Sequence, residues 1–278
     1  MIQDIYPHKY DNTFTFSHEA GEEAPVLLYT AEGLLCLETD PKEIILPRAK
    51  ELPEDLRQEL HFFFRIDDEA YYGLFRLLDQ ALPGMKARKM FSLREAIPKF
   101  RAFAGVTGWQ LTCWYRDTSF CGRCGHPMLE DHIERKRTCP HCGYEIYPKI
   151  SPAVIIAVTH GSRLLLSKYA GREYTRYALL AGFSELGETI EETVHREVME
   201  EVGLKVKNLR FYKSQPWSFS DTLLMGFYCD LDGDLEDITL DEQELSMAGW
   251  FEREELDIRE DDCSLTNEMI IHFMKGNM

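Results

Sequence analysis

Three glutamates, Glu197, Glu200 and Glu201, are crowded within five residues of a segment that favours a helix. At about 100° per residue, Glu197 and Glu201 point within roughly 20° of Ile190, which begins the apolar ridge of that helix. A solvated run of charge should lie opposite the ridge, and like charges four residues apart repel each other. We therefore expect divalent cations between the carboxylates, because hard oxygen ligands suit Mg²⁺ or Mn²⁺. Periodicity alone also allows a merely acidic helix face.

Four of the eight cysteines form two pairs, Cys121-Gly-Arg-Cys124 and Cys139-Pro-His-Cys142. Two such turns supply four thiolates in a tetrahedron, which is typical of structural zinc and leaves no open position for catalysis. The alternative is four unrelated thiols. Three nearby histidines could also serve as ligands, although they are more typical of solvated loops: His126, His132 and His141.

The acidic helix should run from about 190 to 202, because Thr189 and Glu192 fit a capping box and Gly203 fits a terminating residue. Strands are expected before and after it, followed by an amphipathic helix at 266–276. The expected strands are 153–159, 163–169, 209–215, 223–231 and 247–252. This order of elements indicates a layered α/β or α+β domain.

The first 112 or so residues indicate a mixed α/β region, with strands expected at 26–29, 33–38 and 62–67. The segment 70–82 fits either a helix or a strand followed by a turn, and 92–103 fits a helix with Ser92 as its N-cap. The sequence thus predicts three domains. They are an N-terminal α/β domain (1–115), a zinc ribbon (116–149) and a C-terminal domain (150–278).

The composition excludes several classes of function. Apolar residues make up 44% of the 278 residues, so a sizeable core can form, and the net charge of −17 argues against a surface that tracks DNA or RNA phosphates. No apolar run approaches the ~20 residues that span a bilayer, and the N-terminus lacks the order of a signal peptide. We therefore expect a soluble, cytoplasmic protein without membrane partners.

The segment from Gly182 to Leu204 resembles the signature motif of the Nudix hydrolases. Gly182, Glu188 and the run Arg196-Glu-Val-Met-Glu-Glu-Val-Gly-Leu204 occupy every fixed position of that motif. The resemblance implies an α/β/α sandwich in which Glu197 and Glu201 bind the metal and Glu200 is a further ligand or base. It also implies that Arg196 orients these glutamates and that Glu188 braces the loop.

The run Ser214-Gln-Pro-Trp-Ser-Phe-Ser-Asp-Thr222 is similar to the motif of the NADH pyrophosphatase subgroup of this family. That subgroup also carries a four-cysteine ribbon before the Nudix domain. Two prolines of the motif are replaced here by Ser218 and Ser220, which makes the loop less rigid. The resemblance implies substrate contacts from Gln215, Pro216, Trp217, Ser218, Phe219, Ser220, Asp221 and Thr222.

Further site residues follow from local matches to the same subgroup. The carbonyl of Ala181 and the side chain of Glu244 match metal ligands. The positions that match substrate contacts are Arg94, Glu134, Tyr147 and Thr266. An aromatic side chain such as Tyr147 or Trp217 could stack on a nicotinamide or adenine ring.

The resemblance implies metal-dependent hydrolysis of NADH or NAD to NMN(H) and AMP, with Mg²⁺ or Mn²⁺ at the glutamates, zinc in the ribbon and a homodimer. The same bond occurs in nicotinamide-capped RNA, so removal of such caps is a further possibility. One alternative is a Nudix enzyme for ADP-ribose or another linked nucleoside diphosphate, which the altered 214–222 loop favours. Another is a non-catalytic regulator that only binds a nucleotide, which the intact glutamates disfavour.

Overall fold

The computed structural model describes residues 1–37, 42–171, 176–233 and 237–277. The chain divides into two compact units. The C-terminal unit comprises Met1, 150–217 and 222–278, and the N-terminal unit comprises 2–149 and 218–221. The expected N-terminal domain and zinc ribbon thus fall within one unit.

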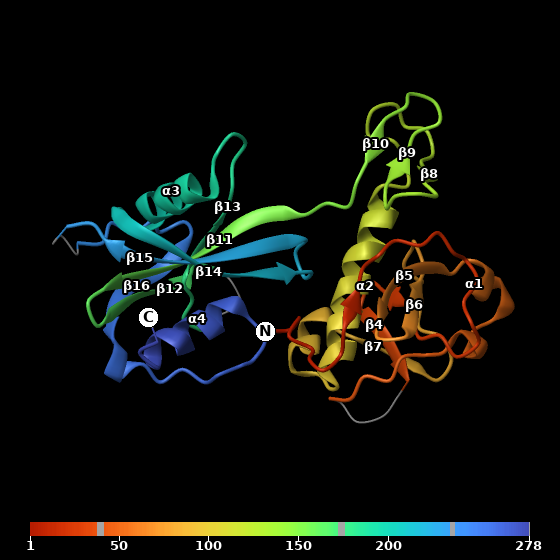
Figure 1. The fold of residues 1–278 in the computed structure, drawn as a ribbon, viewed down its shortest axis with the longest axis horizontal. Helices are drawn as coiled ribbons and strands as arrows, with labels where there is room; N and C mark the ends of the chain where they lie inside the picture. Colours follow the sequence, from red (N-terminus) through yellow and green to blue (C-terminus); the bar gives the residue numbers. More distant parts are fainter. Residues whose placement is uncertain (38–41, 172–175, 234–236, 278) are drawn as a thin grey trace. The chain divides into compact units, whose positions relative to one another are not determined.

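The C-terminal unit is built on one mixed sheet with the strand order β14-β15-β11-β12-β16 (Figure 1). Strand β11 runs parallel to β15 and antiparallel to β12, and β13 pairs with the opposite end of β11 from β12. The bounds are β11 (Ser151–His160), β12 (Arg163–Tyr169), β13 (Leu180–Phe183), β14 (Val206–Trp217), β15 (Thr222–Leu231) and β16 (Leu245–Glu252). Every strand expected in this unit is therefore present.

Helices α3 (Ile190–Val202) and α4 (Leu265–Met274) cover opposite faces of this sheet (Figure 1). Successive side chains of β11 alternate between the two cores, as a strand buried on both faces requires. Val154 and Ile156 pack in the core that holds the valines of α3, whereas Ile155 lies in the core that holds Met269 and Phe273 of α4. The expected helix–sheet–helix layers are thus confirmed in the C-terminal unit.

The two ends of α3 follow the prediction. The Thr189 hydroxyl accepts a hydrogen bond from the Glu192 backbone amide, and the Glu192 carboxylate accepts one from the Thr189 amide. Gly203 ends the helix in the left-handed region at φ 70°, where glycine is favoured. A cap of this kind contributes about 1 kcal/mol, and it fixes which glutamates face the sheet.

The N-terminal unit holds a four-stranded sheet, a three-stranded sheet and the long helix α2 (Lys99–Asp117). The first sheet has the order β1-β5-β6-β2 and the second β3-β4-β7. The bounds are β1 (Tyr10–Asp11), β2 (Val26–Leu27), β3 (Tyr29–Thr30), β4 (Gly33–Leu37), α1 (Glu54–Gln58), β5 (His61–Ile66), β6 (Glu69–Gly73) and β7 (Met85–Arg88). The strand expected at 33–38 extends to Leu37, and residue 38 lies outside the described residues.

The prediction of one helix over 92–103 is wrong in its start, because only 99–103 belongs to an α-helix. Residues Met90–Glu95 form a 3₁₀ helix, and α2 begins only at Lys99, with Pro98 as its N-cap. A proline disfavours helical geometry in the residue before it, so it separates the two elements. Ser92 caps nothing, since its hydroxyl donates to the Lys89 carbonyl. The ambiguous segment 70–82 begins as strand β6 and contains no helix.

The cysteine segment forms a small sheet within the N-terminal unit, with the order β10-β9-β8. Its strands are β8 (Leu129–Glu130), β9 (Arg137–Thr138) and β10 (Glu145–Ile146). They are short, and Cys121, Met128 and Cys139 form the buried core of this part of the chain. A core of that size cannot hold a domain together without a further cross-link.

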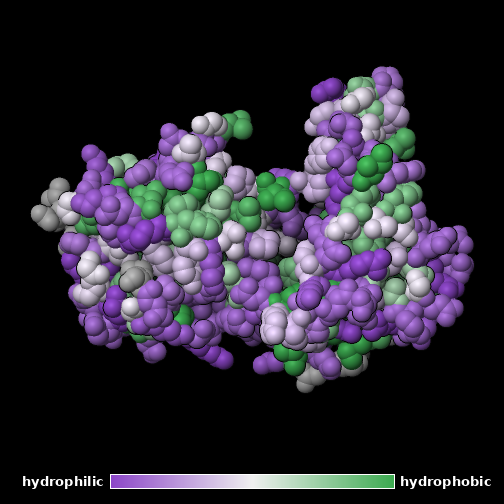
Figure 2. Space-filling model, viewed as in Figure 1, coloured by the Kyte–Doolittle hydropathy of each residue, from purple (hydrophilic) through white to green (hydrophobic). Residues whose placement is uncertain are grey.

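The surface agrees with the charge of the sequence. Hydrophilic residues predominate on the face drawn in Figure 2, and hydrophobic residues form separate patches. Among the described residues, no helix has both the length and the apolar character that crossing a membrane requires.

Candidate functional site

The carboxylate of Glu197, on α3, rests against the backbone of Gly182 in β13. A Cβ atom added at Gly182 would lie 1.9 Å from Cδ and 2.0 Å from Oε1 of Glu197. Any other residue at position 182 would therefore displace this carboxylate. Ala181, the expected carbonyl ligand, is the neighbouring residue of β13. The first expected carboxylate ligand thus lies against the residue that follows the expected backbone ligand.

Arg196 gathers the glutamates around one guanidinium group. Its Nη1 donates to Glu197 Oε1 at 2.7 Å and to Glu200 Oε2 at 2.9 Å. Its Nε and Nη2 donate to the two carboxylate oxygens of Glu188, and Nη2 also donates to the Phe183 carbonyl at 2.9 Å. One planar guanidinium therefore holds both Glu197 and Glu200 of α3 and the loop that leads to the helix.

Glu188 is held from the loop side as well. Besides the guanidinium of Arg196, its carboxylate accepts hydrogen bonds from the Glu185 amide and the Thr193 hydroxyl, each at 3.0 Å. The bond from Arg196, helped by these donors, lowers the pKa of Glu188 to about 2. Glu188 thus remains charged near neutral pH. The geometry agrees with the expected role of Glu188 in bracing the loop.

Glu197 and Glu201 are buried, with exposed fractions of 8% and 2%. Burial raises the pKa of Glu197, and the nearby charges of Glu200 and Glu244 raise it further, whereas Arg196 opposes both. Glu244, which is exposed just before β16, therefore belongs to the same electrostatic cluster. Negative charge exceeds positive charge around α3, which is the imbalance that a bound divalent cation would relieve.

The carboxylate oxygens of the α3 glutamates lie farther from one another than the sulfurs of the ribbon cysteines do. In the described ranges, three groups of potential ligands bring all their ligand atoms within 4.8 Å of one another, and none contains a glutamate of α3. They are the four ribbon cysteines, Cys124 with His126 and His141, and His18 with His61 and Glu130. The acidic donor set suits Mg²⁺ or Mn²⁺.

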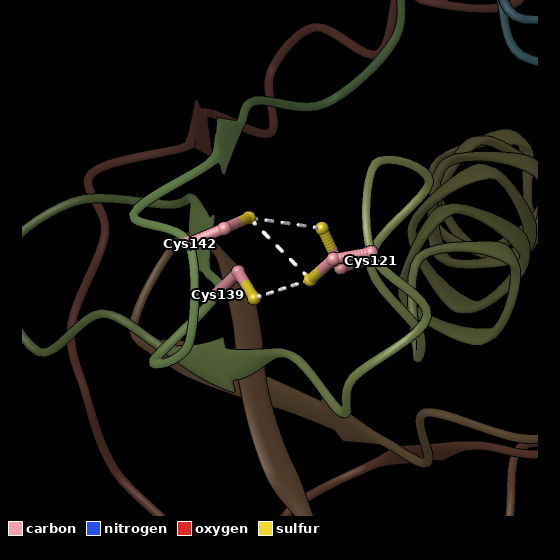
Figure 3. A group of neighbouring side chains, drawn as sticks. Cys121, Cys139 and Cys142 are labelled. Atoms are coloured by element: carbon pink, nitrogen blue, oxygen red, sulfur yellow. Dashed lines mark hydrogen bonds between the residues drawn. The ribbon is translucent and has the colours of Figure 1, made fainter.

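The four ribbon thiols converge on one point (Figure 3). Cys121 Sγ lies 3.6 Å from Cys142 Sγ, and Cys124 Sγ lies 3.5 Å from the sulfurs of both Cys139 and Cys142. A tetrahedral zinc ion with bonds of about 2.3 Å separates its sulfur ligands by about 3.8 Å. The arrangement fits a structural zinc ion.

The two cysteine turns have the same backbone pattern. The Cys121 carbonyl accepts from the Gly125 amide at 2.8 Å, and the Cys139 carbonyl accepts from the Gly143 amide at 3.0 Å. Although burial opposes ionisation, backbone amides directed at the sulfurs lower the pKa of both the Cys121 and Cys139 thiols. Each turn therefore contains one cysteine, Cys121 or Cys139, whose ionisation the backbone favours. His126 and His141 stack on each other at 3.9 Å beside this site.

Two expected substrate contacts in the ribbon touch each other. The Tyr147 hydroxyl donates to Glu134 Oε2 at 2.9 Å, and this bond raises the pKa of Tyr147. Lys136 lies between acidic neighbours, with its Nζ 3.3 Å from Glu134 and 2.7 Å from Glu145. Sequence reasoning missed Lys136, because nothing in its spacing distinguishes it from other surface lysines.

The 214–222 run forms the end of β14, a tip at 218–221 and the start of β15. Gln215 is fully buried, donating to the Cys263 carbonyl at 2.8 Å and accepting from the Leu265 amide at 2.7 Å. This geometry gives Gln215 the role of anchoring the loop to the start of α4. Pro216 and Ser220 are exposed, Trp217, Phe219 and Asp221 are partly buried, and Ser218 and Thr222 are buried.

Two further expected residues belong to different units. In the N-terminal unit, the Arg94 guanidinium lies 4.8 Å from the ring of Phe91, whose centroid is 6.5 Å from that of Phe219. In the C-terminal unit, Thr266 lines a cavity of about 280 Å³ together with Lys168 and Arg176. Arg259 and two acidic side chains, Asp257 and Asp261, also line this cavity, so its lining carries both signs of charge.

Comparison with known proteins places this geometry in a family. Residues 149–270 match the NUDIX domain, and residues 116–147 match the NADH pyrophosphatase zinc ribbon domain. A protein of Pectobacterium atrosepticum described as "NAD-capped RNA hydrolase NudC" is 45% identical over 149 residues, covering 54% of this chain and 56% of that protein. One of Erwinia tasmaniensis with the same description is 41% identical over 170 residues, covering 60% and 64%. The chain thus spans less than two thirds of the length of these relatives.

A solved structure of a NUDIX hydrolase from Nitrosomonas europaea covers 56% of this chain and 90% of its own, with 22% identity and a TM-score of 0.47. The two matched domains together take up more than half of the chain and contain the glutamates of α3 and the four ribbon cysteines. This chain therefore contains a NUDIX domain at 149–270, preceded by an NADH pyrophosphatase zinc ribbon domain at 116–147.

Proposed function

We propose that this chain hydrolyses the pyrophosphate bond of NADH or NAD, giving NMNH or NMN and AMP, with Mg²⁺ or Mn²⁺ as the catalytic ion. The observation that carries the proposal is the pair of buried glutamates on α3, Glu197 and Glu201, in a cluster where Arg196 contacts Glu197 and negative charge is in excess. Buried carboxylates without compensating cations are unfavourable, so their presence supports a cation-binding site.

We assign the following roles to the residues of this site. Glu197 and Glu201 would hold the ion with the Ala181 carbonyl and Glu244, and Glu200 would be a further ligand or the base. A bound divalent ion neutralises the pyrophosphate and activates water for attack on phosphorus. Arg196 keeps Glu197 and Glu200 oriented through Nη1.

The substrate assignment rests on the ribbon, the loop and the relatives. Relatives that share the ribbon and the NUDIX domain are described as NAD-capped RNA hydrolases. Free NAD and an NAD cap contain the same pyrophosphate bond, so one site can serve both. The proposed substrate contacts are Arg94, Glu134, Tyr147, Thr266 and the 215–222 loop, whose start Gln215 anchors.

The substitutions at Ser218 and Ser220 favour a second candidate, hydrolysis of ADP-ribose or another linked nucleoside diphosphate. Initial rates with NADH, NAD, ADP-ribose and an NAD-capped RNA, each with Mg²⁺ or Mn²⁺, distinguish the candidates. The proposal predicts equal amounts of NMNH and AMP from NADH, and the highest kcat/KM for a nicotinamide substrate. A higher kcat/KM for ADP-ribose favours the second candidate. Binding without turnover of any substrate favours the non-catalytic regulator.

The homodimer remains a prediction from the resemblance, and the cytoplasmic location remains a prediction from the apolar runs and the N-terminal sequence. Light scattering of the purified chain at several concentrations measures the first of these. A mass of one chain, about 32.4 kDa, at every concentration would contradict the dimer.

We expect Gly182→Ala to lower kcat at least tenfold while leaving the melting temperature nearly unchanged. The three atoms nearest to the added methyl group all belong to the flexible end of Glu197, so the fold can adapt while the carboxylate moves. Misplacing a catalytic group by about 1 Å can cost about 100-fold in rate. Gly187→Ala is a poor control because Gly187 has φ 94°, so Ala178→Gly, a change of the same size on a buried residue, serves instead. Normal turnover by Gly182→Ala would contradict the placement of Glu197.

A further inference from the structure

A second group of metal-ligating side chains lies in the N-terminal unit, away from the four ribbon cysteines. His18, His61 and Glu130 bring one ligand atom each within 4.8 Å of one another. His18 precedes β2, His61 begins β5, and Glu130 ends β8 of the ribbon. We propose that these three side chains form a second zinc site, which ties the ribbon to the N-terminal α/β region.

The distances fit a small tetrahedral ion. His61 Nδ1 lies 3.2 Å and His18 Nε2 lies 3.9 Å from the same Glu130 oxygen, Oε2. Zinc bonds of about 2.0–2.1 Å to nitrogen and oxygen place neighbouring ligands about 3.3 Å apart in a tetrahedron. Small side-chain adjustments would thus complete three of the four corners. The fourth corner would hold water.

A simple hydrogen bond between histidine and glutamate does not account for the arrangement. In the described part of the chain, Nδ1 of His61 is buried and receives no hydrogen bond, although Glu130 is only 3.2 Å away. The lone pair or proton of His61 Nδ1 therefore does not point at the Glu130 carboxylate. This is the geometry expected when both groups are directed at an ion between them. By contrast, His8 Nδ1 and Asp67 Oδ2 form an ordinary hydrogen bond of 2.8 Å in the same unit.

The surroundings hold the ligands in place. The His61 ring stacks on Phe75 with centroids 3.5 Å apart, and the His18 ring meets His61 edge-on at 4.5 Å. Glu130 and His61 have exposed fractions of 16% and 19%, whereas His18 is 39% exposed. The site is therefore fixed on two sides and open at His18, which gives an ion a path of entry.

The donor set selects the ion. Two imidazoles and one carboxylate suit zinc, whereas Mg²⁺ prefers oxygen ligands alone. Arg137 interacts electrostatically with Glu130, while its Nη1 donates to the Tyr115 carbonyl at 2.8 Å. Among the described residues, no hydrogen bond or salt bridge joins Arg137 to Glu130, and the buried Nε of Arg137 has no hydrogen-bond partner.

Ribbon and α/β region are already in contact around this cluster. Arg135 Nη2 donates to the Phe63 carbonyl at 2.6 Å, and the His132 ring stacks on Phe16 at 3.9 Å. A zinc ion shared by His18, His61 and Glu130 would add a stronger link at the same junction. Its role would be structural, within the N-terminal unit.

Metal content of the full chain tests the site. After dialysis against buffer with excess Zn²⁺ and then without it, the proposal predicts about two zinc ions per chain on the two ligand sets. His18→Ala and Glu130→Gln should each lower this to about one, while His8→Ala, the matched control, should retain two. One ion per chain in the unmodified protein, or two in both His18→Ala and Glu130→Gln, would overturn the proposal.

Titration of the metal-free chain with Co²⁺ needs no variant. The ribbon thiolates should give intense sulfur-to-cobalt charge-transfer absorption with one equivalent of Co²⁺. A second equivalent should add only the weaker visible bands of a nitrogen- and oxygen-ligated ion. If the absorption is complete after one equivalent, or if the second equivalent raises the charge-transfer band, the second site is absent.

Discussion

Glu197→Gln is expected to lower kcat by at least 100-fold while the protein stays folded. The amide keeps the shape of the side chain in the space left by Gly182 and removes the negative charge beside Arg196. Electrostatic stabilisation is often the largest catalytic contribution, and loss of one such group costs about 100- to 1,000-fold in kcat. Glu201→Gln should behave in the same way, because Glu201 is even more buried.

The stability of these variants separates a catalytic from a structural role. Because the folded state raises the pKa of Glu197, the ionised form opposes folding, and this cost grows as pH rises through that pKa. At neutral pH the metal-free Glu197→Gln protein should therefore melt at the same or a higher temperature. The increase in melting temperature caused by Mn²⁺ should shrink.

Glu191→Gln is the matched control, since Glu191 is an exposed glutamate in the first turn of the same helix. It should keep normal kcat and the full stabilisation by Mn²⁺. Near-normal turnover of Glu197→Gln at saturating Mn²⁺ would contradict the assigned role of the buried carboxylate.

Cys121→Ser should destabilise the ribbon strongly. It removes one of four thiolates from a segment whose buried core is very small. Zinc binding in small domains contributes about 10–16 kcal/mol of apparent free energy, so losing a ligand removes much of the driving force for folding. Thermal melting and metal analysis should show an earlier transition and one fewer zinc ion per chain.

Cys113→Ser provides the control for that change. Cys113 is a partly buried free thiol of α2 outside the ribbon, and burial raises its pKa to about 11. Its replacement should leave the zinc content unchanged. A Cys121→Ser protein that keeps its full zinc content would rule out the four-thiolate site.

Local patterns predict the elements that carry the site. The bounds of α3 follow from Thr189, Glu192 and Gly203, because capping depends only on residues close in sequence to the helix ends. The burial of Glu197 and Glu201 follows from their angle to the apolar ridge. Strand β11 follows from a run of apolar and β-branched residues long enough to be buried on both faces.

Contacts between distant segments cannot be predicted in this way. No spacing rule shows that the carboxylate of Glu197 fills the space beside Gly182. Nor does any rule show that the side-chain amide of Gln215 hydrogen-bonds to the backbone of residues 263 and 265. The start of α2 is mispredicted because the apolar pattern continues across Pro98, whereas the helical backbone begins only after this proline. The His18, His61 and Glu130 group joins three distant segments and carries no motif.

Electron paramagnetic resonance of Mn²⁺ tests the central claim most directly, because free Mn²⁺ gives a sharp six-line signal that is lost on binding. Titration of the full chain should show saturable loss of this signal, and Glu191→Gln should do the same. The Glu197→Gln, Glu201→Gln double variant should leave the signal of added Mn²⁺ almost unchanged. Equal binding by the double variant and the unmodified chain would contradict the claim that the buried glutamates of α3 hold the catalytic ion.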